Sequence, residues 1–396
     1  MKTSHRLIFF LNAFSTGLVA AVLSLIYLAH GADIQTLSIF ISIFAVSTIL
    51  LELPSGILAD LFGRKKMFLL AALCSAASNF LLIFAHTPWL LGISCIFRGA
   101  GTAFASGSLE SLEVEQSVQS GGNLSAINSA IAVTEGMGLA LGAVCGGILG
   151  NAEDAYVLLL GTAAGIECAV FVLTAFFIQT TARRPQKASR KVKEQLSALV
   201  RGLKESKILR LIFSASILTG SVQAVTEVYW QQNFIACAPS NFRWSIGILC
   251  ALGYAAVILG SKTEPRLADR MGDFPLYWLT KFALPPVVAA LGLCQDWQLF
   301  VCIYVLIDIV LGIGDVSERT LLHAAVEDAC RASMLSVYSL ALRIGVVISS
   351  VSAAVIVPKW GAIGIWLIVP LSALALLTAL FLTAGRETLK PPCEKN

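Results

Sequence analysis

Residues 56–66 read Gly-Ile-Leu-Ala-Asp-Leu-Phe-Gly-Arg-Lys-Lys and lie between two long apolar runs. The tripeptide Leu-Ala-Asp at 58–60 is followed three residues later by Gly63. The same tripeptide recurs at 267–269 and is again followed three residues later by Gly272. Each copy follows an even-numbered apolar run of its half of the chain. Repetition of one motif predicts that the chain consists of two related halves.

The composition places these halves in a membrane. The chain has 396 residues, of which 57% are apolar and only 13% are charged, against about 25% charged in soluble domains. The mean hydropathy is +0.81. These values exclude a soluble fold, a disordered chain and collagen. Twelve spans of about 21 residues would use about 250 residues and leave only short loops.

Twelve apolar runs are long enough to cross a bilayer. The first is too long for the core of a signal peptide, which has about 7–15 residues. The predicted helices cover 7–28, 35–58, 67–85, 89–109, 124–149, 155–178, 208–230, 244–261, 274–294, 297–317, 333–357 and 361–384. We therefore predict an all-α integral membrane protein with 12 transmembrane helices in two six-helix bundles.

The positive charges predict the orientation, because cytoplasmic loops are enriched in Lys and Arg. The loops on one side hold Lys2, Arg6, Arg64, Lys65, Lys66, the segment 179–207, Lys262, Arg266, Arg270, Arg319, Arg331, Arg386, Lys390 and Lys395. The loops on the other side hold only Arg243 and Lys359. Both termini are therefore expected in the cytoplasm, which agrees with an even number of helices.

Segment 179–207 is the longest polar stretch and divides the chain into bundles at 1–178 and 208–396. Five apolar residues recur in it at helical spacing, namely Val192, Leu196, Leu199, Val200 and Leu203. This pattern predicts an amphipathic helix on the inner membrane surface, held by anionic lipid. A regulatory or nucleic-acid role is the alternative, but a basic linker beside lipid explains the charges, and no nucleic-acid partner is expected.

The motif at 56–66, preceded by Glu-Leu-Pro-Ser at 52–55, resembles the loop signature of the major facilitator superfamily in the form seen among drug and metabolite exporters. The resemblance covers the whole chain, since the helix count, the long central loop and the weaker second copy agree with it. It implies a monomeric transporter in the inner (plasma) membrane. It also implies that Asp60 docks on the start of helix 11, near Ser333, and that Arg64 reaches Glu110 or Glu113.

The chemistry of this motif suits a gate. Gly56 permits close helix approach, and Asp60 can meet the positive N-terminus of another helix. Gly63 permits a tight turn, and Arg64 faces the negative inner leaflet. In the second copy, where Asp269 and Gly272 match, Pro265 replaces the first glycine and Asp273 replaces the base, so that copy is degraded. The alternative is a simple turn with positive-inside charge.

Arg98 lies within the fourth apolar run, where an unpaired charge costs about 3 kcal/mol on insertion scales. It resembles the helix 4 arginine that the family uses in proton coupling. Gly101 follows after three residues rather than the usual four. The alternative is a structural arginine that snorkels.

The fifth run carries Gly138, Gly142, Gly146 and Gly147. The first three fall on one helical face at spacing i, i+4, i+8. This run resembles the glycine-rich signature of family exporters, although Ala143 stands where proline is usual. We expect these glycines to let the two halves approach; close helix packing alone is the alternative.

Acidic residues inside the apolar runs are candidates for proton coupling, because a carboxylate in hydrocarbon must be paired or protonated. Glu135 and Asp308 are favoured, since the resemblance puts them on cavity-lining helices, and Glu52 is a further candidate. Glu167, on a peripheral helix, is demoted. Static ion pairs with Arg98, Lys281 or Arg343 are the alternative for each acid.

We therefore expect proton-coupled export of a small organic molecule by alternating access, driven by the proton gradient without a cofactor. A dedicated metabolite or siderophore exporter, an importer of the same fold and a membrane sensor that does not transport remain alternatives. Neither an enzyme nor a metal site is expected, because the ten cysteines and four histidines show no ligand spacing. Weaker candidates for the substrate cavity are Phe14, Glu227, Tyr254 and Tyr338, along with other aromatic residues that more often pack helices.

Overall fold

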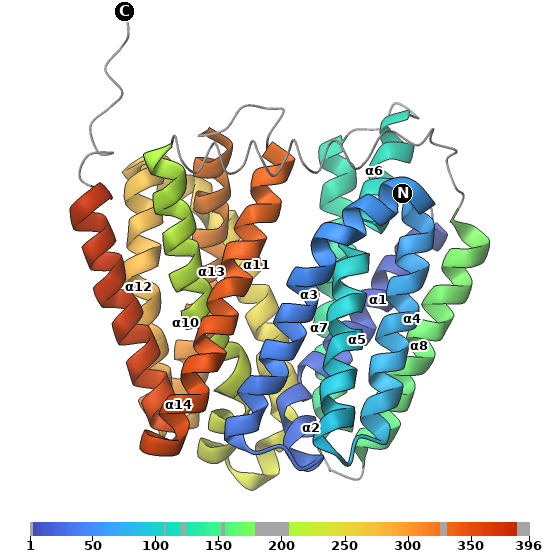
Figure 1. The fold of residues 1–396 in the computed structure, drawn as a ribbon, viewed down its shortest axis with the longest axis horizontal. Coiled ribbons are helices and arrows are strands. Elements are labelled where there is room, and N and C mark those ends of the chain that lie inside the picture. The colour runs from blue at the N-terminus through green and yellow to red at the C-terminus, as the bar shows by residue number, and fades with distance from the viewer. Residues whose placement is uncertain are drawn as a thin grey trace, which may run out of the picture. The chain divides into compact units, whose positions relative to one another are not determined.

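The computed structural model describes residues 3–106, 108–119, 124–151, 155–178, 206–324 and 331–385. Within these ranges all regular structure is helical (Figure 1). The predicted amphipathic helix at 179–207 falls almost wholly outside the described residues.

The chain forms two compact units, Met1–Ser189 with Phe234–Ala255, and Arg190–Asn233 with Ala256–Asn396. The first half of the chain contributes α1 (Thr3–Ala20), α2 (Leu23–Ala29), α3 (Ile34–Phe62), α4 (Arg64–Ile83), α5 (Pro88–Ala105), α6 (Leu109–Gln119), α7 (Leu124–Leu149) and α8 (Tyr156–Phe177). The second half contributes α10 (Lys207–Cys237), η2 (Ser240–Ser245), α11 (Ile246–Met271), α12 (Asp273–Leu293), α13 (Trp297–Ala324), α14 (Arg331–Leu380) and η4 (Phe381–Gly385). Segment 234–255 groups with the first unit, whereas the sequence suggested one division at the central linker.

Ten helices in the described ranges are long and apolar enough to cross a membrane, or 11 if the bent pair α1–α2 counts as one span. The two helices of that pair meet at 50°, so the helix predicted at 7–28 is broken into two. The break falls at Ala21 and Val22, where neither Pro nor Gly marks it in the sequence.

Helix α14 has 50 residues and would be about 75 Å long if straight, against a hydrocarbon core of about 30 Å. Gly361 interrupts it with φ 66° and ψ −170°, a left-handed backbone that favours glycine. The interruption lies where the sequence predicted a new helix to begin, at residue 361.

Several helices extend past their predicted ends. Helix α3 continues to Phe62, so residues 56–62 of the motif are helical rather than looped. Helix α11 likewise runs to Met271 and includes the second Leu-Ala-Asp. The predicted fourth helix ends earlier, at Ala105, and a separate α6 follows it.

Gly63 and Gly272 confirm the internal repeat in backbone geometry. Gly63 has φ 90° and ψ 143°, and Gly272 has φ 83° and ψ 152°. Each ends one helix, by donating its N–H to the carbonyl of Ala59 or Ala268, and begins the next. An L side chain at either position would be strained, so the predicted tight turn requires glycine in both copies.

The glycine face of α7 packs against α1, within the same unit. A methyl group on Gly142 would overlap the carbonyl oxygen of Phe14, and one on Gly146 would overlap that of Leu18. A methyl group on Gly138 would lie 2.6 Å from the carbonyl oxygen of Phe10. These three glycines therefore pack closely against α1, which is the alternative of close helix packing, and the approach of the two halves at this face stays a prediction.

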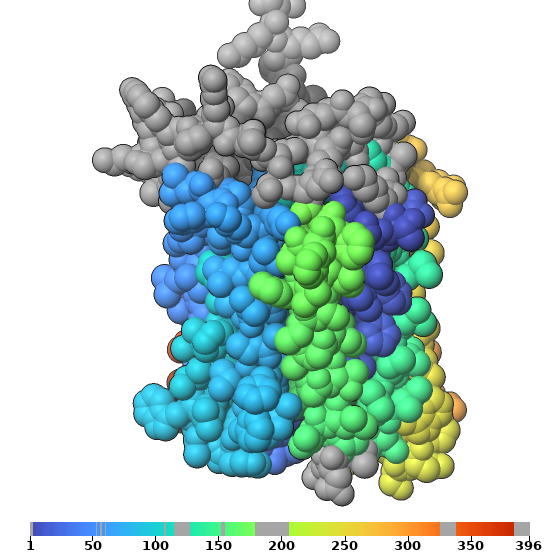
Figure 2. Space-filling model, turned by 90° about the vertical axis from the view of Figure 1, so that its right-hand side faces the viewer, coloured from blue at the N-terminus to red at the C-terminus, as the bar shows by residue number. Residues whose placement is uncertain are grey.

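The outer faces of the helices carry apolar side chains, as a lipid environment requires. Figure 2 shows one such face, where α8 lies beside α4. Phe176 on α8 is 80% exposed, and Val157 and Leu158 are also largely exposed. Apolar exposure on this scale is not tolerated in water, so the chain is a multi-pass membrane protein.

Candidate functional site

Arg98 lies on α5, half-buried, within the first unit. Its guanidinium carbon sits 5.1 Å from the centre of the Phe44 ring on α3. The same group lies close to the hydroxyl of Tyr27, which also contacts Cys95 Sγ at 3.3 Å. Among the described residues no carboxylate lies within 4 Å of Arg98. The charge is therefore held by aromatic and hydroxyl groups in this conformation.

Glu135 lies on α7 and is half-buried. The charged side chain that interacts with Glu135 is a second acid, Glu110 on α6, so the interaction is repulsive. No basic side chain of the described residues pairs with it, so the static ion pair considered from the sequence is not formed here. Two mutually repelling carboxylates beside an apolar span attract a proton or an organic cation.

Asp308 repeats this arrangement in the second unit. It is half-buried on α13, and the field that reaches it comes from Glu227 on α10. One turn away on the same two helices, the rings of Trp230 and Tyr304 lie with their centroids 4.9 Å apart and their planes tilted by 37°. Acidic and aromatic groups therefore converge where α10 meets α13, and aromatic faces also attract organic cations.

A buried ion pair in the second unit was not predicted. Lys281 Nζ on α12 lies 2.6 Å from Glu318 Oε2 on α13, and the two side chains are 3% and 1% exposed. Lys281 also donates to Thr219 Oγ1 at 2.9 Å, and Ser216 donates to the other oxygen of Glu318. The network joins α10, α12 and α13, and every charged atom in it has a partner.

A second buried carboxylate lies beside this network. Glu264 on α11 accepts a hydrogen bond of 2.9 Å from Ser317, the residue before Glu318. Glu264 is 3% exposed. Lys281 was considered from the sequence as an ion-pair partner for the acids inside the apolar runs. In the structure its partner is Glu318.

The first unit has its own buried pair, between His5 Nδ1 on α1 and Glu113 Oε2 on α6 at 2.5 Å. Both side chains are at most 5% exposed. Glu113, which the family resemblance offered to Arg64, therefore engages His5.

Glu167 is more enclosed than the favoured acids. It is 3% exposed on α8, close to the Ser15 hydroxyl of α1, and its Oε2 has no hydrogen-bond partner. The sequence analysis demoted Glu167 because of its helix, but its burial against α1 makes it a candidate for coupling beside Glu135, Asp308 and Glu52.

The gate motif is only partly described. The side chains of Asp60 and Ser333 and the surroundings of Gly56 lie outside the described set, so the Asp60 contact stays a prediction. Arg64 is half-buried, and the neighbouring Lys65 donates to the Ala175 carbonyl at 2.7 Å, which ties the start of α4 to the end of α8. Asp269, in the second copy, is exposed.

The remaining predicted positions are dispersed. Glu52 and Phe14 are half-buried, and Tyr254 is half-buried in the part of α11 that belongs to the first unit. Tyr338 donates to Asp315 at 3.2 Å, and Asp315 also pairs with Arg319. Gly147 lies against Gly247 at the start of α11, again within the first unit.

Long apolar helices in two units, packed through glycines and carrying half-buried acids and arginine, define a polytopic membrane protein. The sequence matches the Major Facilitator Superfamily model over residues 7–314. The chain belongs to this superfamily, as the motif at 56–66 predicted. Because the family consists of transporters, the expectation that the chain is not an enzyme is confirmed.

The chain is similar to proteins named for multidrug resistance. The chain is 25% identical over 296 residues to the Multidrug resistance protein MdtH of Shigella dysenteriae serotype 1 (strain Sd197), covering 73% of this chain and 69% of the relative. It is 26% identical over 298 residues to the protein of that name from Escherichia coli O9:H4 (strain HS), with the same coverage.

Solved structures show the same fold. The nucleoside transporter NupG superposes with a TM-score of 0.80 at 14% identity, over 96% of this chain and 98% of that one. A POT family transporter in complex with a thioalcohol-conjugated peptide gives 0.74 at 14% identity, over 97% and 96%.

Proposed function

We propose that this protein exports small amphipathic organic molecules across the inner (plasma) membrane in exchange for protons. The observation that carries the proposal is the pair of half-buried acids, Glu135 and Asp308, which no described basic side chain neutralises. A carboxylate in an apolar span that lacks a cation can exchange a proton for a substrate, as coupling requires. The proton gradient is the energy source, without a further cofactor.

The proposed topology has twelve spans. The bent pair α1–α2 counts as one, and α14 divides at Gly361 into two, which adds two spans to the ten long helices. Both termini then lie in the cytoplasm, in agreement with the distribution of Lys and Arg. The transporter is proposed to act as a monomer.

The substrate class follows from the α10–α13 region. Asp308 and Glu227 offer negative charge, and Trp230 and Tyr304 offer two aromatic rings, which are buried in this conformation. This combination favours a planar organic cation. The name of the relatives, Multidrug resistance protein, supports tolerance of several such molecules.

The proposed cycle is alternating access, with the motif at 56–66 as the cytoplasmic gate. Protonation of Glu135 or Asp308 releases a bound cation on the outer side, and deprotonation on the inner side restores the binding charge. Arg98, on α5, supplies the fixed positive charge that favours deprotonation as helices move.

An importer of the same fold is the second candidate, because the structural neighbours include nucleoside and peptide transporters. The direction in which the substrate crosses the membrane distinguishes an importer from an exporter. Inside-out membrane vesicles energised with a proton gradient should accumulate the fluorescent cation ethidium if the protein exports it.

Glu135→Gln and Asp308→Asn should each reduce this uptake, and Asp296→Asn, at an exposed acid just before α13, serves as the matched control. A protonophore should abolish uptake by the wild type. Uptake that both variants and the protonophore leave unchanged would refute proton-coupled export.

A further inference from the structure

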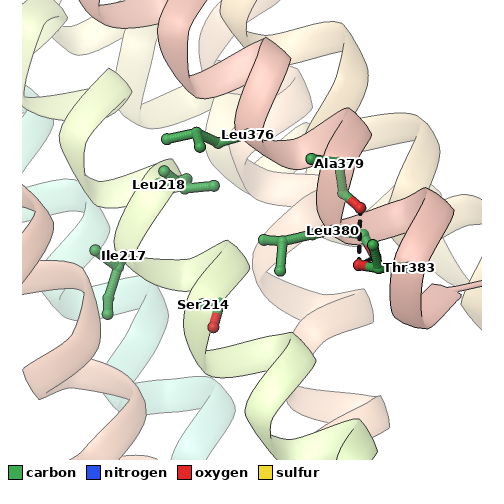
Figure 3. Close-up of a pocket in the computed structure, with 7 residues that line it drawn as sticks. All are labelled: Ser214, Ile217, Leu218, Leu376, Ala379, Leu380 and Thr383. Atoms are coloured by element: carbon green, nitrogen blue, oxygen red, sulfur yellow. Dashed lines mark hydrogen bonds between the residues drawn. The ribbon is translucent and has the colours of Figure 1, made fainter.

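A groove opens between α10 and α14 in the second unit, away from the acids of the proposed transport site. Its cavity volume is about 390 Å³, within the range of small-ligand pockets. Seven residues line it: Ser214, Ile217, Leu218, Leu376, Ala379, Leu380 and Thr383 (Figure 3).

The wall of the groove is apolar along most of its length. Figure 3 shows Leu380 pointing from α14 into the space beside α10. The hydroxyl of Thr383 donates to the carbonyl of Ala379 at 2.8 Å, so its proton is used within its own helix. Ser214 carries the other hydroxyl and lies at the Lys207 end of the stretch of α10 that lines the groove.

Positive charge lies directly beyond Ser214. Lys207 and Arg210 are both exposed. Arg210, Ser214, Ile217 and Leu218 follow the spacing i, i+4, i+7, i+8, so they share one face of α10. Lys207 lies one further turn away, and Arg210 is about 6 Å along the axis from Ser214.

We propose that this groove binds one anionic phospholipid. An acyl chain lies against Leu218, Leu376 and Leu380, and the headgroup phosphate meets Ser214, Arg210 and Lys207. Leu376 to Thr383 span about 10 Å of helix, which suits part of one acyl chain. Basic pockets between transmembrane helices bind such headgroups.

The two cations select the headgroup. Each Lys or Arg near the surface contributes to the binding of anionic lipid, and a zwitterionic headgroup gains much less from them. Removing both charges should weaken binding by about 30-fold, equivalent to about 2 kcal/mol. The inference does not depend on the proposed substrate or direction of transport.

The test is native mass spectrometry of the full-length protein with an equimolar mixture of phosphatidylglycerol and phosphatidylcholine. The wild type should retain one phosphatidylglycerol in preference to phosphatidylcholine. Lys207→Gln with Arg210→Gln should lose that preference, and Leu380→Trp, which fills the groove, should lose the bound lipid.

Two matched controls separate the groove from general charge and bulk. Lys262→Gln with Arg266→Gln removes two exposed charges from α11, and Thr378→Trp adds the same bulk to an exposed position of α14. Both controls should retain phosphatidylglycerol as the wild type does. Equal retention of the two lipids by the wild type, or unchanged retention after Lys207→Gln with Arg210→Gln, would overturn the proposal. A thermal midpoint for each variant confirms that it is folded.

Discussion

Gly142 lies directly over the carbonyl oxygen of Phe14, where α7 crosses α1. The second unit repeats this relationship 203 residues later, since Gly345 lies over the carbonyl of Ile217 (142 to 345, and 14 to 217). Gly17 over Leu139 and Gly220 over Leu342 show the same displacement. The first and fifth helices of each half are therefore packed by one shared geometry.

This packing predicts that Gly142→Ala destabilises the protein. The added methyl group would meet backbone atoms that cannot move aside, at a cost of about 1–3 kcal/mol. Gly161→Ala on α8 is the control, because nothing lies within 4 Å of a methyl group there. Thermal unfolding in detergent should show a lower midpoint for the first variant only. Equal midpoints for the two would contradict the packing.

The Lys281–Glu318 pair makes a different prediction. Lys281→Met leaves a buried carboxylate without its cation, which typically costs about 3–5 kcal/mol. Adding Glu318→Met removes that charge as well, so the double variant should recover most of the loss. Thermal midpoints of the single and double variants measure the effect. A double variant no more stable than the single one would show that Lys281 does not act by neutralising Glu318.

Asp33 predicts a pH effect at the start of α3. The backbone N–H of Thr36 donates to Asp33 Oδ1 at 2.7 Å and holds the pKa of this carboxyl below its usual range. The stabilisation is therefore complete above the usual pKa of aspartate and is lost as the pH falls through the lowered one. Asp33→Ala should cost about 1 kcal/mol at pH 7. Asp33→Asn keeps a neutral cap, and its midpoint should show less dependence on pH below about 4 than the wild type.

Arg98 is predicted to act in transport rather than in packing. Arg98→Lys keeps the charge but loses the planar group over Phe44, so it should transport poorly. Arg98→Ala should shift the pH optimum upward, because a carboxylate that approaches this position as the helices move would be easier to protonate without the cation. The pH profile of ethidium efflux at matched expression measures both. If both variants follow the wild-type curve, Arg98 is structural.

The sequence predicted the class of fold and the repeat because both follow from local patterns. Long apolar runs require a membrane, and the turn at Gly63 or Gly272 needs glycine wherever it falls. Helical spacing also identified the glycine face of α7. The spacing of the glycines shows that they share one face of α7, but it does not show which helix packs against that face. The structure identifies that helix as α1.

The sequence reasoning missed the contacts of four buried titratable residues for one shared cause. His5, Glu113, Glu264 and Glu318 all lie just beyond the predicted ends of apolar runs, which were placed at 7, 109, 261 and 317. Hydropathy ends a span at the first charges, whereas α1, α11 and α13 continue through them and α6 follows a short break. Partners far apart in sequence, such as Lys281 and Glu318, could then be paired only in three dimensions.

The central claim is exchange of protons for an organic cation, and proton movement driven by substrate tests it most directly. Purified protein in liposomes, with a pH-sensitive dye in the lumen and no imposed pH gradient, receives ethidium on one side. We predict that a downhill flow of ethidium drives protons in the opposite direction, and that Glu135→Gln with Asp308→Asn abolishes this movement. Ethidium flow without proton movement, or with protons moving in the same direction, would contradict the account.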